Sequence, residues 1–191
     1  MFIPIRFTGL YYNVIMSEIS TTTPEKKEIL DDNARKFTLG GLSPAYLDDH
    51  DASSFVMTTD WLVVDEDREE KLAYKKFKDG EIQILLIKKV MDREGRRTSV
   101  KEKIAEEGYQ ELKVRSVLQV EKTRFEFTYP QNGINFLMKY DEFADSELRV
   151  LEVDAKSDYE RELFDKVQFP TALTEVTGNL DYYGYRVASV L

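Results

Sequence analysis

The chain has 191 residues and a formal net charge of −9, with 27 Lys and Arg against 36 Asp and Glu, which argues against a general nucleic-acid or membrane-surface binder. It has no cysteine and a single histidine, His50, so disulfides, thiolate metal sites and histidine-rich zinc or copper sites are excluded, and a Ser-His-Asp triad is disfavoured. Any bound metal is therefore expected to be a hard cation held by oxygen atoms, such as magnesium or manganese.

We assign residues 1–31 to an N-terminal extension that is partly disordered or helical. Its opening run MFIPIRFTGLYYNVIM is apolar and aromatic, but a proline and an arginine interrupt it and no small-residue cleavage site follows, so a signal peptide is not expected. Thr23-Pro24 has the spacing of an N-cap and a first helical position, which predicts a short helix. No apolar run in the chain approaches the ~20 residues that a membrane span needs. We therefore expect a cytoplasmic protein without a membrane partner, whose main domain comprises residues 32–191.

From residue 35 onwards, the sequence is dominated by short β-rich segments that alternate between apolar and polar residues. Ser43-Pro44 predicts the start of a helix rather than a catalytic serine. Asp79-Gly80 and Asn132-Gly133 are strong hairpin signals, and strands joined by tight turns pair antiparallel. The predicted strands cover residues 53–64, 71–78, 81–90, 116–129, 134–143 and 147–156, with further strand character at 173–177 and 185–191.

Two longer helical patterns interrupt the strands. Apolar side chains recur on one helical face within residues 102–112. Residues 157–167 begin with Ser157 and Glu160 at the spacing of a capping box. The pattern as a whole predicts an α+β protein, in which a large antiparallel sheet or barrel carries a few helices on its outside.

Several strands carry charged residues at alternate positions, so that one face of the strand is ionic and the other apolar. Glu152 and Asp154 share one face in VLEVDAK, and Lys122 and Arg124 share one face in EKTRFEF. In one interpretation these faces point to solvent, as in an ordinary half-buried antiparallel sheet. In the other, the sheet closes into a barrel with a polar interior, where basic side chains bind an anion and carboxylates hold a divalent cation. A polyphosphate bound together with magnesium or manganese would satisfy both sets of charges.

Four motifs occur in order in the second half of the chain: Lys-x-Arg at Lys122, Asp-x-Phe at Asp141, acid-x-acid at Glu152, and Pro170 followed by Glu-Val-Thr. Together they resemble the CYTH domain, also called the triphosphate tunnel metalloenzyme family. Members of that family are closed antiparallel barrels that bind triphosphate-containing substrates and divalent cations. The resemblance covers roughly residues 32–188. It favours the second interpretation and implies a closed antiparallel β-barrel, or tunnel, with a few helices packed outside.

The first half departs from the family pattern at several ionic positions. The family's opening Glu-x-Glu-x-Lys is Asp32, Ala34 and Lys36 here, so the second acid is lost. Its Arg-x-Glu-x-Glu strand begins at Arg97, but a serine and a lysine occupy the acidic positions. Because alanine cannot ligate a metal, these departures leave open an altered substrate choice, weaker catalysis or a binding module without turnover.

The resemblance implies a role for each matching ionic residue. We expect a divalent-metal-dependent phosphohydrolase that acts on a small-molecule triphosphate or other polyphosphate-containing substrate, with no nucleic-acid duplex as partner. The alternative is a non-catalytic or weakly active binder of phosphorylated ligands on the same fold, and a third reading is an open sheet used for protein contacts. The implied catalytic residues are Lys36, Glu152 and Asp154, and the implied ligands of Mg²⁺ or Mn²⁺ are Asp32, Glu152 and Asp154. The implied phosphate-binding residues are Lys36, Lys76, Lys78, Lys88, Arg97, Lys122 and Arg124, with Asp141 and Glu175 as further candidates.

Overall fold

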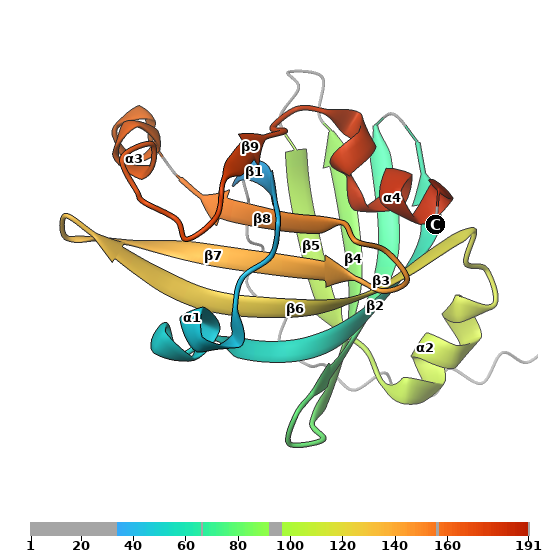
Figure 1. The fold of residues 1–191 in the computed structure, drawn as a ribbon. Coiled ribbons are helices and arrows are strands. Elements are labelled where there is room, and N and C mark those ends of the chain that lie inside the picture. Colours follow the sequence, from blue (N-terminus) through green and yellow to red (C-terminus); the bar gives the residue numbers. More distant parts are fainter. Residues whose placement is uncertain (1–33, 66, 92–96, 156, 191) are drawn as a thin grey trace, which may run out of the picture.

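The computed structural model describes residues 34–65, 67–91, 97–155 and 157–190, shown in colour in Figure 1. The predicted N-terminal extension, residues 1–31, and the predicted metal ligand Asp32 lie outside the described residues. The main part of the predicted domain is therefore the part of the chain that can be compared with the sequence analysis.

Within the described residues, nine strands form one sheet in the order β5-β4-β3-β2-β6-β7-β8-β1-β9, and all of its pairings are antiparallel. The antiparallel sheet expected from the hairpin signals is thus confirmed. The strands are β1 (Ala34–Leu39), β2 (Ser53–Val64), β3 (Arg68–Phe77), β4 (Ile82–Met91), β5 (Arg97–Lys103), β6 (Leu118–Gln131), β7 (Ile134–Phe143), β8 (Arg149–Asp154) and β9 (Leu173–Glu175).

Both predicted hairpin turns are present, and each uses backbone that favours glycine or asparagine. Gly80, between β3 and β4, has φ 90°, and the turn between β6 and β7 has Asn132 at φ 47° and Gly133 at φ 80°. A left-handed backbone is accessible to glycine and, at lower cost than for most residues, to asparagine. These two turns fix the register of the hairpins that carry most of the ionic residues.

In the part of the chain that the structure describes, four α-helices connect or follow the strands: α1 (Pro44–Asp49), α2 (Glu106–Lys113), α3 (Asp158–Phe164) and α4 (Gly184–Val190). Ser43 caps α1 by accepting from the Tyr46 N–H, and Ser157 caps α3 by accepting from the Glu160 N–H, as their spacing predicted. The strand predicted at residues 185–191 was wrong, because this segment is the helix α4. Among the described residues, none of the helices combines the length and the apolar character needed to traverse a lipid bilayer.

The sheet is strongly curled, and β3–β5 run across the direction of β6–β8 in the view of Figure 1. Its edge strands are β5 and β9, and within the described residues these two are not hydrogen-bonded to each other. The expected closure into a hydrogen-bonded barrel is therefore not confirmed, although the antiparallel architecture is.

The two faces of the sheet differ in the helices that cover them. Residues that are opposite one another in neighbouring strands lie on the same face of the sheet. The helices α1, α2 and α3 all cover one of the two faces, which we call the outer face. Leu151, Met138 and Phe37 pack there with Phe164 of α3, and the Tyr109 hydroxyl of α2 donates to Asp60 at 3.0 Å. The opposite, inner face carries most of the alternating charges predicted from the sequence.

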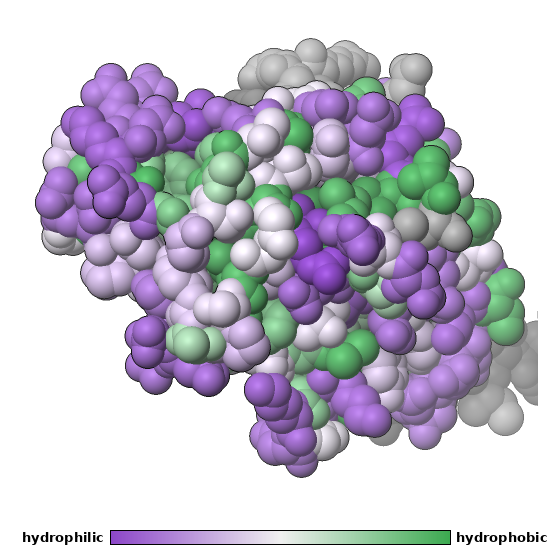
Figure 2. Space-filling model, in the orientation of Figure 1, coloured by the Kyte–Doolittle hydropathy of each residue, from purple (hydrophilic) through white to green (hydrophobic). Residues whose placement is uncertain are grey.

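The helix α4 packs on one end of the inner face. Val187 lies in a buried cluster with Trp61, Val120 and Phe143. The approach at the start of α4 is close, because a Cβ added at Gly184 would lie 3.1 Å from the Trp61 ring. The far side of α4 stays in contact with solvent, and hydrophobic residues gather there in Figure 2. One end of the inner face is thus closed by an apolar contact that excludes water.

Substitution of Val187 by aspartate is expected to detach α4 from the sheet. Val187 is 2 % exposed, and burying an unpaired carboxylate costs on the order of several kcal/mol. Trp61 is the only tryptophan in the chain, so its emission in Val187→Asp should shift to longer wavelength and become more sensitive to acrylamide quenching. Ser189→Asp, at an exposed position of the same helix, is the control and should leave the spectrum unchanged. An unshifted spectrum in a folded Val187→Asp protein would contradict the packing of α4 described above.

Candidate functional site

An ionic cluster occupies the middle of the inner face and joins β1, β6 and β8. Lys36 is opposite Glu152 in the β1–β8 register, and its Nζ lies 3.0 Å from Glu152 Oε1. Arg124 of β6 reaches the same carboxylate, with 3.4 Å between Nη2 and Oε2. The ring of Tyr183, from the segment that precedes α4, lies 4.7 Å from Lys36 Nζ. Residues that are distant in the sequence therefore converge on one carboxylate.

A buried carboxylate, Asp141 of β7, holds the two basic residues of β6. Arg124 donates to both of its oxygens, with Nε–Oδ1 and Nη2–Oδ2 distances of 2.6 and 2.7 Å. Lys122 donates to the same Oδ2 atom. Asp141 is only 1 % exposed, so these hydrogen bonds supply the pairing that a buried charge requires. The geometry makes Asp141 a positioning residue for Lys122 and Arg124.

The electrostatics keep Glu152 charged. Burial on its own would raise the pKa of Glu152, but the nearby charges of Lys36, Arg124 and Lys122 lower that pKa well below its usual range. Burial lowers the pKa of Lys122, the neighbouring Arg124 lowers it further, and Asp141 opposes both effects. The pKa values of Glu152 and Lys122 therefore depend on the charges that surround them.

A second ion pair extends the cluster along β7 and β8. Lys139 Nζ donates to Asp154 Oδ2 at 2.8 Å, and both side chains are partly exposed, at 24 % and 33 %. Lys139 is opposite Glu152 and Glu126 in the registers of its two neighbouring strands. Acids and bases thus alternate across this half of the inner face, in agreement with the paired-acid face predicted for β8.

Two lysines of β3 also face this cluster, and the sequence analysis missed both. Lys75 is opposite Met57, which is opposite Lys122, so register places the two lysines on the same face. The Lys75 ammonium lies 4.9 Å from the Phe55 ring centroid, and burial lowers its pKa.

The other lysine, Lys71, lies nearer the closed end. It donates to Glu69, and its ammonium lies 5.6 Å from the Trp61 ring. Burial lowers the pKa of Lys71 to about 8, although Glu69 acts in the opposite direction. Its side chain is still 20 % exposed, so the amine remains in contact with the solvent of the inner face.

Three of the lysines expected to bind phosphate lie elsewhere. Lys76 and Lys88 project from the outer face, next in sequence to residues that face inward, and the Lys88 Nζ lies 3.8 Å from Glu70. Lys78 lies in the turn between β3 and β4 and is exposed. The cause is the two-residue period of a strand, because a register error of one residue transfers a side chain to the opposite face.

Glu175 is also placed away from the cluster. Its carboxylate pairs with Arg35 on the outer face, with 2.6 Å between Oε2 and Nη2, and Arg35 also contacts Asp165 at 2.6 Å. Hydrogen bonding from Arg35 lowers the pKa of Glu175. This pairing links β1, β9 and the end of α3, which is a structural contact. The predicted residue Arg97 is at the start of β5, opposite Met91, and its side chain lies outside the described part of the structure.

The carboxylates of the inner face fit a metal site that is shared with a ligand better than a metal site formed by protein side chains alone. Among the described residues, no group of three or more His, Cys, Asp or Glu side chains is arranged to hold a metal ion. Glu152 and Asp154 are two carboxylates on one face of β8, and Ala34 is opposite Asp154 where the resemblance would place another acid. Magnesium is commonly held by one or two carboxylates together with substrate phosphates. The two acids therefore fit a cation shared with a phosphorylated ligand, and do not form an all-protein cage.

Comparison with known proteins finds solved structures that are similar to this one, but no match by sequence. No protein-family model matches the chain, and no curated protein matches its sequence. Two solved structures of the protein NE1496, described as a hypothetical protein and as an inorganic triphosphatase, are similar to it with a TM-score of 0.56. Their identities are 21 % and 20 %, and the matches cover 81 % of this chain and 95 % and 92 % of theirs. PH1012 from Pyrococcus horikoshii OT3 matches with a TM-score of 0.45 and 12 % identity over 69 % of this chain and 86 % of its own. The chain shares the fold of NE1496.

The amine of Lys71 is expected to titrate near pH 8, well below the ~10.4 of an unperturbed lysine. As the pH falls through about 8, the folded protein takes up this proton and the inner face gains positive charge. Between about pH 8 and about pH 10 the unfolded chain binds more protons, so this group makes the folded state more stable as the pH rises through that window. Titration of ¹³C-methylated lysines by NMR, with the signal assigned by its absence in Lys71→Arg, measures the midpoint. A midpoint near pH 10 would show that Lys71 is not buried as described.

Proposed function

We propose that the chain is a CYTH-type hydrolase that binds a triphosphate or other polyphosphate-containing small molecule on its inner face. The observation that carries this proposal is the convergence of Lys36, Lys122 and Arg124 around Glu152, which was expected only if the ionic faces share one site. The shared fold with NE1496, one structure of which is described as an inorganic triphosphatase, supports the same class. Fold alone does not fix an activity, so the proposal depends on these residues.

The basic residues would bind phosphate oxygens by exchanging carboxylate partners for the ligand. Glu152 is 21 % exposed at its side chain, so its contacts with Lys36 and Arg124 can be reached by an incoming anion. Arginine binds phosphate through two parallel N–H donors, and lysine acts as a point charge. Asp141 would keep Lys122 and Arg124 in place during the exchange, because its own contacts are buried.

Glu152 and Asp154 are the residues that would hold Mg²⁺ or Mn²⁺, with the undescribed Asp32 as a third ligand. Such a cation would offset the charge of the transferring phosphoryl group and position the attacking water. Lys36 and Lys139 pair with these carboxylates and would hold them in the orientation that faces the ligand. The enclosed tunnel expected from the resemblance is also part of this proposal.

A second candidate function is binding without turnover. It is favoured by the pairing of Glu152 and Asp154 with lysines and by Ala34, whose position opposite Asp154 provides no ligand. In that case the inner face would bind polyphosphates through its cations alone, independently of a divalent metal.

Phosphate release separates the two candidates. The protein is expected to release phosphate from tripolyphosphate with magnesium or manganese and to stop when EDTA is added. Glu152→Gln is expected to lower kcat/KM by about a hundredfold, because the change removes a carboxylate that holds both the cation and Lys36. Glu121→Gln, on an exposed position of the outer face of β6, is the matched control and should retain activity. Binding of tripolyphosphate without release under any metal condition would establish the second candidate instead.

Two adjacent lysines of β3 provide a test of whether the ligand binds on the inner face of the sheet. Lys75→Met is expected to weaken tripolyphosphate binding by roughly tenfold or more, because a hydrogen bond to a charged group contributes about 1.5–3 kcal/mol. Lys76→Met removes the same charge from the opposite, outer face and should change the Kd less than about twofold. Isothermal titration calorimetry at two salt concentrations measures both variants. Equal losses in the two variants would mean that the lysines act only through net charge, and the inner face would then not be the binding site.

A further inference from the structure

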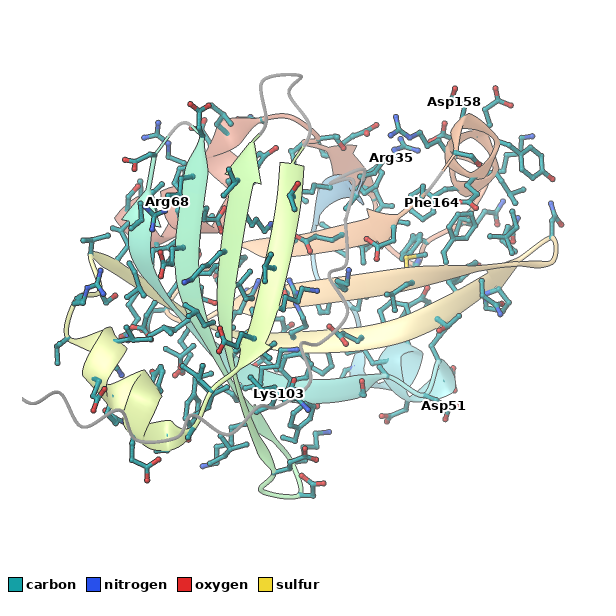
Figure 3. All side chains as sticks on the ribbon, turned by 180° about the vertical axis from the view of Figure 1, so that it is seen from behind. Arg35, Asp51, Arg68, Lys103, Asp158 and Phe164 are labelled. Atoms are coloured by element: carbon teal, nitrogen blue, oxygen red, sulfur yellow. The ribbon has the colours of Figure 1, made fainter. Side chains whose placement is uncertain are left out.

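The ion pair between Lys139 of β7 and Asp154 of β8 lies on the inner face, beside the central cluster. Its Nζ–Oδ2 distance is 2.8 Å. Asp154 is the last residue of β8, and the chain continues to α3, where Asp158 is labelled in Figure 3. The closed end of the inner face lies in the other direction along this strand, because Val150 belongs to the apolar cluster that contains α4. The pair is therefore at the end of β8 that is distant from α4.

The carboxylates of the inner face become more accessible in the direction of this pair. Asp141 is opposite Val150 in the register of β7 and β8, and its side chain is 1 % exposed. The exposure of the side chain is 21 % for Glu152 and 33 % for Asp154. A buried charge must keep its partner, whereas a partly exposed ion pair contributes little stability and can exchange its partner at little cost. The carboxylate of Asp154 is thus the one whose cation is displaced most readily.

The strand register explains why Lys139 pairs with Asp154. Lys139 is directly opposite Glu152, but that carboxylate already contacts two cations of the central cluster. Lys139 instead reaches Asp154 on the diagonal, across a separation of roughly 7–8 Å that long side chains can span. Ala34 is opposite Asp154 on its other side and provides no charge. The ammonium of Lys139 therefore compensates the charge of Asp154.

The negative charge of these carboxylates is already compensated by protein side chains. Within the described residues, Asp141, Glu152 and Asp154 are contacted by four basic side chains, Lys36, Lys122, Arg124 and Lys139. A divalent cation that approaches alone meets charges of its own sign and must displace an ammonium from Asp154. A triphosphate brings several negative charges and offers Lys139 phosphate oxygens in place of the carboxylate. The arrangement therefore favours a metal ion only when a polyanion is present.

We propose that Lys139 is a counter-ion that keeps Asp154 from binding a divalent metal until a triphosphate is bound. In the ligand-free protein, the ammonium of Lys139 occupies this carboxylate. When a triphosphate binds, Lys139 transfers its contact to phosphate oxygens, and Asp154 becomes available to Mg²⁺ or Mn²⁺. The inference rests on the proposed function, and it assigns the coupling between metal and ligand to a lysine that was not among the expected phosphate-binding residues.

Binding of Mn²⁺ to the ligand-free protein tests this assignment. The measurement is the relaxation rate of water protons, which increases when Mn²⁺ binds to a macromolecule. Lys139→Met is expected to bind Mn²⁺ roughly tenfold or more tightly than the wild-type protein, because an apparent affinity is reduced by the fraction of molecules whose site is available. Lys139→Gln provides a second variant with the same expected gain.

Three further variants separate the ion pair from a general effect of charge. Lys139→Arg keeps a cation beside Asp154 and should bind Mn²⁺ as weakly as the wild-type protein. Lys76→Met removes one lysine from the outer face and should also leave the affinity for Mn²⁺ unchanged. Addition of Asp154→Asn to Lys139→Met should abolish the gain, because the carboxylate that holds the metal is then absent.

The same measurement with a ligand tests the coupling. The probe is the Mn²⁺ complex of a non-hydrolysable imido analogue of tripolyphosphate. The wild-type protein is expected to bind this complex at concentrations at which Mn²⁺ alone does not bind. Because coupling between two ligands is reciprocal, the ratio of the Mn²⁺ affinities with and without the analogue should fall roughly tenfold in Lys139→Met.

The outcomes distinguish this inference from the proposed function. If the analogue binds but Mn²⁺ alone binds equally to the wild-type protein and to both Lys139→Met and Lys139→Gln, the role of Lys139 is wrong and the central site stands. Tight binding of Mn²⁺ alone by the wild-type protein would contradict the role of Lys139 as well. If the analogue binds neither in EDTA nor with Mn²⁺, the proposed function is wrong and this inference falls with it.

Discussion

The pairing of Asp141 with Lys122 and Arg124 is the interaction on which the inner face depends. A carboxylate that is 1 % exposed must be compensated, and here two cations compensate it. The arrangement leaves the two cations preorganised, so little side-chain entropy remains to be lost when an anion binds. Glu152 completes the coordination of Arg124 from a more exposed position. Exchange with a ligand would therefore take place at Glu152, while Asp141 stays in its buried contacts.

The two ends of the charged inner face differ in structure. Packing of α4 against Trp61 removes water from one end of the inner face, and the β6–β7 hairpin projects from the opposite end (Figure 1). Low-dielectric walls strengthen the field of nearby charges, so the apolar cluster at the closed end is part of the electrostatics and not only of the stability. The same exclusion of water explains why the pKa of Lys71, close to Trp61, is lowered.

Much of the fold and the centre of the site could be predicted from local sequence rules. The turns at Gly80 and Gly133 and the alternating charges of β6 and β8 were identified because hairpin chemistry and two-residue periodicity are local. Lys75 was missed and Lys76 chosen in its place because the face of β3 relative to β6 is set through β2, and no local pattern encodes that register. For α4 the apolar composition suggested a strand, and only its packing on Trp61 selects the helix.

The net negative charge of the protein opposes the polyanionic ligand proposed for it, but the two charges act over different distances. The net charge of −9 is felt by a distant anion only within about a Debye length, ~8 Å at physiological ionic strength. On the inner face, Lys36 and Arg124 are partly desolvated, at 16 % and 14 % exposure of their side chains, and their interactions are weakly screened. Acidic residues elsewhere would disfavour long or loosely bound polyanions such as nucleic acid, whereas a compact anion that reaches the cluster gains the full local attraction. The distribution of charge therefore favours a small, highly charged ligand over an extended one.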